Sequence, residues 1–346
     1  MASVFWKGAD VSFLDEIEEK GGRYFFGDTA ADALAICKEL GFNCIRLRLW
    51  NDPEHGYCGP ARTLAMARRV HAMGMQLMID FHYSDTWADP GKQFKPAAWR
   101  ELPFDALVDA VHEFTRSFLQ AMVDQGTPPA AVQIGNEVTY GMLWEDGRVP
   151  GPSAAEQPAA WERFARLLAA GSSACRKVLG RAVDVVVHID RGGDNAGSRF
   201  FLDHLLPYDV DFDTLGLSFY PWWHGTLAQF EANVCDLATR YAKDIALVET
   251  AYPWADNDVI HGNPWADDDV PIAGQAEVRP SVEGQRAFLA SVFRIMRNLP
   301  GDRGKGVFYW EPAWIPVHGQ VTGWHYNGLF DLGGRVLPSA TVVADA

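Results

Sequence analysis

The sequence predicts an α/β protein that forms a single (β/α)8 TIM barrel over residues 1–346. Eight apolar segments of strand length alternate with eight helical segments, and this alternation is typical of parallel strands joined by right-handed crossovers. The length of 346 residues suits one such barrel, and no Gly/Ser linker or charge block divides it. A doubly wound open sheet is the alternative, but no Gly-x-Gly-x-x-Gly turn follows the first predicted strand.

The first half of the chain shows four strand–helix units. A strand at 5–11 precedes a helix at 31–40, for which Asp28-Thr29-Ala30 offers the N-cap and Gly41 the stop. The second strand, 43–50, alternates strictly, so that Arg46, Arg48 and Trp50 share one face. Arginines that face a barrel interior require buried anionic partners. The remaining elements are the helices at 63–73, 104–125 and 161–179 and the strands at 76–84 and 130–137.

The second half continues the same alternation and ends in a short helix. Its strands are predicted from apolar runs, most of which end in polar or turn-forming residues. A long irregular loop, 255–280, interrupts the pattern once. The predicted strands are 182–190, 214–221, 245–250 and 306–312, and the helices are about 200–206, 227–243, 282–298 and a short last one within 337–346.

Composition excludes several classes of partner. The formal net charge of −15 disfavours binding to nucleic acid or to an anionic membrane. No uninterrupted apolar run is long enough to span a bilayer, and residues 1–7 lack the features of a signal peptide. The five cysteines show no metal-site or disulfide spacing and are expected to be buried thiols. Many of the 13 tryptophans lie in predicted loops, where indoles suit stacking on sugar rings.

Two predicted strands end in a glutamate, Glu137 and Glu249. In a (β/α)8 barrel the fourth and seventh strands face each other across the mouth, and active sites lie at the C-terminal ends of the strands. The two carboxyls are therefore a candidate acid/base or acid/nucleophile pair for glycoside hydrolysis. Two unrelated carboxylates in local salt bridges are the alternative. Polar residues at other strand ends favour the functional interpretation, among them Asp10, Arg48, Trp50, His82, Asn136, His188, Tyr220 and Trp310.

Several motifs resemble one known family. Asn136-Glu137, Glu249 and Trp310 resemble the pattern of clan A retaining glycosidases. More specifically, the chain is similar to glycoside hydrolase family 53, the endo-β-1,4-galactanases. The motifs that carry this resemblance along nearly the whole chain are 7–12 (KGADVS), 45–50 (IRLRLW), 80–90 (DFHYSDTWADP), 133–137 (QIGNE), 248–252 (VETAY), 309–312 (YWEP), 329–331 (LFD) and 337–339 (LPS).

The resemblance implies Glu137 as acid/base and Glu249 as nucleophile of a retaining hydrolase of β-1,4-galactan. We expect Arg48 and the Tyr220 hydroxyl to keep Glu249 ionised, and Asn136 to donate to the sugar 2-hydroxyl. The expected stacking platforms are Trp87, Trp310 and Trp222. The full set of predicted substrate-binding residues is Asp10, Arg48, Trp50, His82, Asp85, Trp87, Asn136, His188, Tyr220 and Trp310.

The loop at 256–263 (DNDVIHGN) resembles the calcium loop of bacterial members of the family. Its oxygen and imidazole ligands would be Asp256, Asp258, Asn263 and His261, and a solvated acidic loop is the alternative. The chemistry requires no cofactor. The expected partner is the polysaccharide substrate, bound by a monomer. The resemblance implies secretion, although the absent signal peptide leaves the cytoplasm as the alternative. A mannanase or cellulase would share both glutamates, and a non-catalytic carbohydrate-binding barrel belongs to another class.

Overall fold

The computed structural model describes residues 4–152, 157–257, 280–317 and 321–346. The described residues contain a closed barrel of eight parallel strands, each paired with the next along the chain and the last with the first. The predicted TIM barrel is therefore confirmed. Its strands are β1 (Trp6–Asp10), β4 (Cys44–Leu49), β5 (Gln76–Phe81), β6 (Ala131–Ile134), β9 (Asp184–Ile189), β10 (Thr214–Phe219), β11 (Asp244–Thr250) and β12 (Gly304–Trp310).

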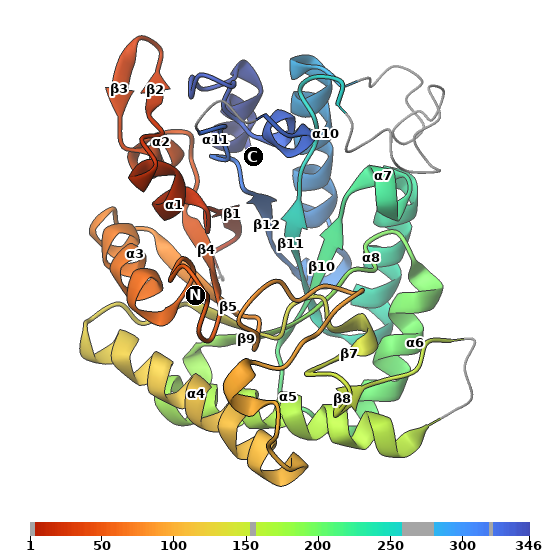
Figure 1. Cartoon of the computed structure of the whole chain (residues 1–346). Helices are drawn as coiled ribbons and strands as arrows, with labels where there is room; N and C mark the ends of the chain where they lie inside the picture. The colour runs from red at the N-terminus through yellow and green to blue at the C-terminus, as the bar shows by residue number, and fades with distance from the viewer. Residues whose placement is uncertain (1–3, 153–156, 258–279, 318–320) are drawn as a thin grey trace.

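Helices surround the barrel and cover the outer faces of its strands (Figure 1). Each of the eight strands is followed by one of the predicted helices, and apolar residues on the inner face of each helix pack against the sheet. These helices are α2 (Ala33–Glu39), α3 (Pro60–Ala72), α4 (Phe104–Asp124), α5 (Pro158–Leu179), α6 (Asn195–Leu205), α8 (Leu227–Tyr241), α10 (Val282–Arg297) and α11 (Val342–Asp345).

Shorter elements lie between these strands and helices, mostly near the strand ends. They are α1 (Leu14–Glu19), α7 (Pro221–His224), the hairpin of β2 (Tyr24–Phe26) and β3 (Thr29–Ala31), and the hairpin of β7 (Gly141–Met142) and β8 (Gly147–Arg148). Single 3-10 turns occur at Ala97–Trp99, Val138–Tyr140, Gly180–Ala182, Leu206–Tyr208, Pro300–Asp302, Gly323–Asn327 and Pro338–Thr341.

Four helices begin elsewhere than the sequence predicts. Helices α3 and α5 each begin three residues earlier, at Pro60 and Pro158, and aspartate caps set the starts of α2 and α6. The expected N-cap at Asp28 is wrong, because Thr29–Ala31 pairs as a strand with Tyr24–Phe26. The side chain of Asp32 caps α2 instead, accepting from the N–H groups of Leu34 and Ala35 at 2.7 and 3.2 Å. Helix α6 begins five residues earlier than expected, where the Asp194 side chain accepts from the Gly197 N–H at 2.9 Å.

The barrel interior changes from apolar to polar along its axis. Its lower part is filled by an apolar cluster of Trp6, Cys44, Met78, Ala131, Val186, Ala246, Val248 and Phe308. The Phe308 ring lies over Gly8, where an added Cβ would approach it to 2.1 Å, so only glycine fits on β1 at this level. Two residues further along β4, β5 and β6 the same inward face carries Arg46, Asp80 and Gln133. The apolar layer therefore forms the floor of a polar site.

The sequence predicts buried free thiols. All five cysteines are free, and four of them are buried. Within the described parts of the chain, no helix combines the length and apolar character needed to cross a membrane.

Candidate active site

A sharp turn after β6 brings Glu137 to the mouth of the barrel. Gly135 and Glu137 both have positive φ, 78° and 47°. A Cβ at position 135 would lie 2.5 Å from Cγ1 of Val138, so the turn requires glycine for space as well as for conformation. A non-glycine residue in this region is strained, and such strain concentrates at functional sites. The turn places Glu137 in the wall of a cavity.

A bulge in β11 brings Glu249 to the same opening. Leu217 pairs with Leu247, but the next residue of β10, Ser218, pairs with Glu249. The extra residue, Val248, belongs to the apolar cluster inside the barrel. Because Val248 faces inward, strict alternation would point the Glu249 side chain outward. The bulge lets Glu249 face inward as well, where its carboxylate pairs with Arg46.

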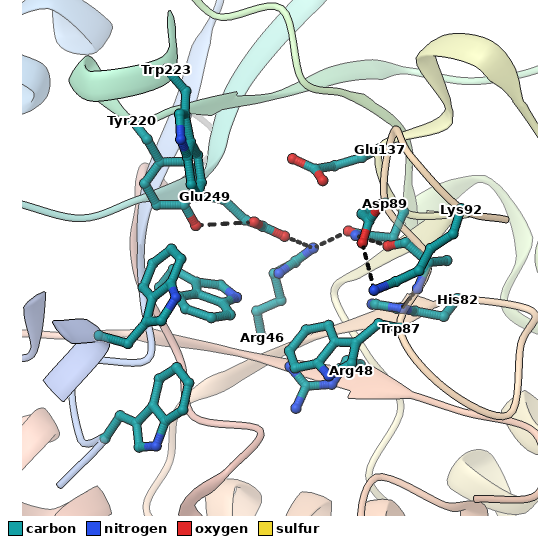
Figure 2. A pocket seen from close by; sticks show the side chains of 15 residues that line it. Arg46, Arg48, His82, Trp87, Asp89, Lys92, Glu137, Tyr220, Trp223 and Glu249 are labelled. Carbon is teal, nitrogen blue, oxygen red and sulfur yellow. Dashed lines mark hydrogen bonds and ion pairs between the residues drawn. The ribbon is translucent and has the colours of Figure 1, made fainter. Parts of the chain in front are cut away.

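The two glutamates line a cavity of about 350 Å³ at the C-terminal ends of the strands. Figure 2 shows Glu137 on one side of this cavity, with Glu249 and Tyr220 on the other. The lining residues come from nearly every strand end and from the loops that follow them. They are Arg46, Arg48, His82, Trp87, Ala88, Asp89, Lys92, Asn136, Glu137, Tyr220, Trp223, Glu249, Trp310, Trp314 and Trp324.

Arg46 is the buried cation at the base of the cavity. Its guanidinium lies 2.6 Å from Asp10 Oδ2, 2.9 Å from Asp80 Oδ2 and 2.9 Å from Glu249 Oε1. It also donates to Asn136 Oδ1 at 3.0 Å. One cation thus faces three carboxylates, which leaves an excess of negative charge beneath the site.

The expectation that Arg48 is the cation beside Glu249 is wrong, because Arg46 fills that role. Both arginines point inward, as the alternation predicts. The Arg48 guanidinium turns instead to Glu311, 3.6 Å away, and lies over the Trp87 ring at 4.1 Å from its centre.

The protonation of the two glutamates follows from their surroundings. Burial raises the pKa of Glu249 to about 7, with the nearby Asp80 and Asp10 adding to the rise, while Arg46 and the hydrogen bond from Tyr220 oppose it. Burial raises the pKa of Glu137 well above its usual value, and the charges of Glu249 and Asp190 add to that rise. In the described chain no cation lies within ion-pair distance of Glu137. A proton entering the site therefore favours Glu137.

A buried serine links Glu137 to a buried histidine. The Ser218 hydroxyl donates to Glu137 Oε1 at 2.7 Å. The hydroxyl oxygen of Ser218 also lies 2.8 Å from His188 Nε2. Burial, with Arg46 nearby, lowers the pKa of His188 well below its usual value, so the imidazole is neutral. With Ser218 donating to Glu137, the hydroxyl oxygen accepts from Nε2–H, and Nδ1 accepts from the Gln133 amide at 3.1 Å.

Tryptophans form one wall of the cavity. Trp310 lies at its centre, with the Trp324 ring 5.0 Å and the Trp314 ring 5.7 Å away. Trp223 projects from α7 and is 46% exposed. Flat apolar faces around polar donors are what a pyranose ring requires, because its own faces are apolar and its edges carry hydroxyls.

The structure brings most of the predicted site residues together. Arg48, His82, Trp87, Asn136, Tyr220 and Trp310 line the cavity with the two glutamates. Of the other predicted residues, Asp10, Trp50 and His188 contact residues of this lining, and Asp85 lies apart from it on the loop after β5. Asp10 bonds to Arg46; Trp50 donates its indole N–H to His82 Nδ1 at 3.3 Å; His188 contacts Ser218; and Asp85 accepts from the backbone N–H groups of Asp52 and Ala97. Trp222 is buried and absent from the lining.

The sequence reasoning missed several residues of the site. Arg46 and Ser218 carried a usable signal, because they share strand faces with Arg48 and Tyr220. The others come from loops and from short elements that follow the strands, Trp223 from α7 and Trp324 from the 3-10 turn Gly323–Asn327, where no periodicity indicates direction. These are Asp89, Lys92, Trp223, Trp314 and Trp324.

The predicted calcium loop falls mostly outside the described residues. Of its expected ligands only Asp256 is described; Asp258, His261 and Asn263 are not. Among the residues that the structure describes, no group of three or more His, Cys, Asp or Glu side chains is arranged to hold a metal ion.

Comparisons with known proteins agree with this geometry. The family model described as glycosyl hydrolase family 53 matches residues 6–343. An endo-beta-1,4-galactanase of Bacillus subtilis (strain 168) is 35% identical over 328 residues, which cover 92% of this chain and 72% of the relative. A protein of Niallia circulans, described only as uncharacterized, is 44% identical over 343 residues, covering 97% of this chain and 92% of the relative.

A solved structure is similar in fold over nearly the whole chain. The family 53 catalytic domain from Ignisphaera aggregans is 37% identical, with a TM-score of 0.86. The superposition covers 98% of this chain and 95% of that domain.

Proposed function

Because the chain belongs to glycosyl hydrolase family 53, we propose that it is an endo-acting β-1,4-galactanase that retains the anomeric configuration. The family match confirms the resemblance inferred from the motifs. One observation carries the mechanism. Glu249 is held by Arg46 at 2.9 Å and by the Tyr220 hydroxyl at 3.1 Å, whereas the described partner of the Glu137 carboxyl is the neutral Ser218 hydroxyl. The two carboxyls are thus set for different tasks.

In the first step Glu249 attacks the anomeric carbon. Its Oε atom forms the new C–O bond as the glycosidic C–O bond breaks, and Glu137 gives its proton to the departing oxygen. Arg46 and Tyr220 favour the ionised nucleophile, and burial with nearby negative charge favours the protonated acid.

In the second step Glu137, now ionised, takes a proton from water. The oxygen of that water attacks the anomeric carbon and displaces Glu249, which leaves as a carboxylate. Two inversions at the same carbon give net retention. The ionised Glu137 accepts the Ser218 hydrogen bond, which stabilises the charge it has just gained.

The tryptophan wall and the cavity floor supply substrate recognition in this proposal. Trp310, Trp324 and Trp87 offer stacking faces for galactosyl rings, and Asn136 offers a hydrogen-bonding edge. Both ring nitrogens of His82 are bonded to protein groups, Nδ1 to Trp50 and Nε2 to Asp80, so His82 contributes to the cavity wall but offers no free donor. The Asn136 side chain already donates to the Ala88 carbonyl at 2.9 Å, which fixes its orientation. Its second amide hydrogen is the donor proposed for the sugar 2-hydroxyl.

The proposal extends to the compartment, the oligomeric state and a bound calcium ion. The enzyme acts as a secreted monomer on galactan or type I arabinogalactan, and a structural calcium ion binds the loop that contains Asp256. Chelation with EDTA should then lower the melting temperature, since a ligand that binds only the folded state stabilises it. An unchanged melting curve would reject the calcium site alone.

Sugar release decides the substrate. The protein should release short oligosaccharides early from linear β-1,4-galactan and little from β-1,4-mannan or cellulose, which would be the substrates of a related β-1,4-glycanase. Glu249→Ala should lower kcat by about 10⁴-fold or more. A wild-type protein that binds galactan without cleaving it would instead be a carbohydrate-binding barrel.

Product stereochemistry decides the two roles. With azide, Glu249→Ala should give the inverted α-glycosyl azide, because no covalent intermediate forms. Glu137→Ala with an aryl galactobioside should give the β-azide, because the intermediate still forms from a good leaving group. The opposite pairing would reverse the assignments of Glu137 and Glu249.

A further inference from the structure

Arg48 is a buried cation that has no task in the two catalytic steps. Its side chain is 1% exposed and reaches the wall of the cavity between the two glutamates. Nη1 lies 3.6 Å from Glu311 Oε1, beyond hydrogen-bond reach, and Nη2 donates to the Cys58 sulfur at 3.4 Å. Within the described chain Nε is buried without a partner. A buried cation with so few acceptors is costly and needs another source of stabilisation.

Aromatic faces supply that stabilisation. The guanidinium carbon of Arg48 lies 4.1 Å from the centre of the Trp87 ring, 4.7 Å from that of Phe13 and 4.9 Å from that of Trp50. A cation is attracted to the face of an aromatic ring, and more strongly where water is excluded from both. Trp87 is the nearest of the three rings, and it is also a proposed stacking platform for the substrate (Figure 2).

The same contact orients the ring of Trp87. This residue follows β5 on an irregular stretch, and among the residues that the structure describes its indole N–H has no acceptor. The four neighbouring aromatic rings are all inclined to the indole by at least 52°, so none of them stacks on either face. The Arg48 guanidinium therefore covers one face of Trp87 and leaves the other for a sugar ring.

Two residues that hold Arg48 have a strained backbone. Cys58 and Glu311 have positive φ, 59° and 48°, in the left-handed region that residues with a side chain rarely adopt. Both oxygens of the Glu311 carboxylate also accept from the Phe13 N–H, at 3.1 and 3.3 Å, which fixes the carboxylate beside Arg48. Such strain concentrates where a geometry serves function.

We propose that Arg48 is a positioning residue, which holds the indole of Trp87 in place as the stacking platform for a galactosyl ring. It acts through the face of Trp87 and not on the reacting atoms. This inference rests on the proposed galactanase function.

A double-mutant cycle between Arg48 and Trp87 tests the proposal. Arg48→Met keeps an unbranched apolar side chain and removes the planar guanidinium. It should raise KM for linear β-1,4-galactan about fivefold, with kcat within about twofold of wild type, because the platform loses its orientation while both glutamates keep their partners. Trp87→Ala removes the platform itself and should raise KM by more. In that background Arg48→Met should have no further effect on KM, because a positioning residue acts through the group that it positions.

Two further variants guard against an effect on folding alone. Arg48→Met leaves the Glu311 carboxyl buried without its cation, whereas Arg48→Met combined with Glu311→Gln removes both charges. The combined variant should show the same rise in KM, and it replaces the single variant if that one does not fold. Arg148→Met is the matched control, because Arg148 lies over the Trp144 ring at 4.4 Å but outside the cavity. It should leave KM unchanged.

Two results would overturn the positioning role while leaving the galactanase proposal intact. One is a full effect of Arg48→Met on KM when position 87 is already alanine, which would mean that Arg48 does not act through the indole. The other is an unchanged KM in both variants that lack Arg48. A wild-type protein that cleaves another β-1,4-glycan but not galactan would instead overturn the proposed function, and the same cycle on that glycan would still decide the role of Arg48.

Discussion

The guanidinium of Arg46 lies 2.9 Å from Glu249 Oε1, and the hydroxyl of Tyr220 lies 3.1 Å from Oε2 of the same carboxylate. Each oxygen of the nucleophile therefore has its own donor, one charged and one neutral. Arg46 also neutralises part of the charge on Asp10 and Asp80, so its removal would leave buried carboxylates unpaired. Tyr220 can be altered without that consequence.

The first prediction concerns the Tyr220 hydroxyl. Tyr220→Phe keeps the ring among Trp222, Trp310 and Trp324 but removes the hydrogen bond to Glu249. That bond lowers the pKa of Glu249, so its loss should raise the pKa and move the acidic limb of kcat/KM to higher pH. We expect kcat on galactan to fall about tenfold or more. Tyr241→Phe, which removes an exposed hydroxyl bonded to Asp203, is the control, and an unshifted acidic limb would contradict the prediction.

The second prediction concerns the Ser218 hydroxyl. It donates to Glu137, and this bond lowers the pKa of the acid. Ser218→Ala should therefore raise the pKa of Glu137 and move the alkaline limb of kcat/KM to higher pH. Activity at neutral pH should fall, because the ionised Glu137 of the second step loses its donor. Ser291→Ala, at a partly exposed position on α10, should leave the profile unchanged. An alkaline limb that moves to lower pH would show that Ser218 favours the protonated form.

The barrel itself was predictable from the sequence because its determinants are local. Alternating apolar faces and helix stops gave all eight strands and helices in the right order. Where prediction erred, the cause was a local interaction that periodicity does not encode. The hairpin that consumes Thr29–Ala31 moved the cap from Asp28 to Asp32, and the Asp194 cap extended α6 toward its N-terminus.

Site residues on strands were predictable from alternation. Contacts that depend on the length of a side chain or on the register of a strand were less predictable. Alternation placed Arg46 and Arg48 on one face but gave no reason to prefer either as partner of Glu249. Likewise, the bulge at Val248 is invisible in the sequence, although it is what lets Glu249 face inward. Trp314 and Trp324 come from loops after β12, whose course depends on packing with distant segments.

The third prediction concerns Trp223. Its side chain is 46% exposed and lines the cavity, so Trp223→Ala should fold normally while losing a stacking face. We expect KM for galactan to rise about tenfold with a smaller change in kcat. Phe26→Ala is the matched control, because Phe26 is also 46% exposed but lies on the β2–β3 hairpin and outside the cavity. An unchanged KM for the Trp223 variant would remove this residue from the binding surface.

The fourth prediction concerns stability, because the groups that serve catalysis oppose folding. Burial and the charges of Asp80 and Asp10 raise the pKa of Glu249 to about 7, above its ordinary value near 4.5. The folded state thus holds this proton more tightly than the unfolded state between these two values. The contribution of Glu249 to stability is complete below about pH 4.5 and is lost as the pH rises through about 7.

Glu249→Gln removes this ionisation, and the amide can still accept from Arg46. The variant should therefore be more stable than wild type at pH 8, by on the order of 2 kcal/mol, and the difference should vanish toward pH 4.5. Urea unfolding at pH 4.5, 6 and 8 measures it. Glu231→Gln, on the exposed side of α8, should show no such pH dependence. If the Glu249→Gln variant were less stable than wild type at pH 8, the ion pair between Arg46 and Glu249 would stabilise the fold by more than the burial of the Glu249 charge destabilises it.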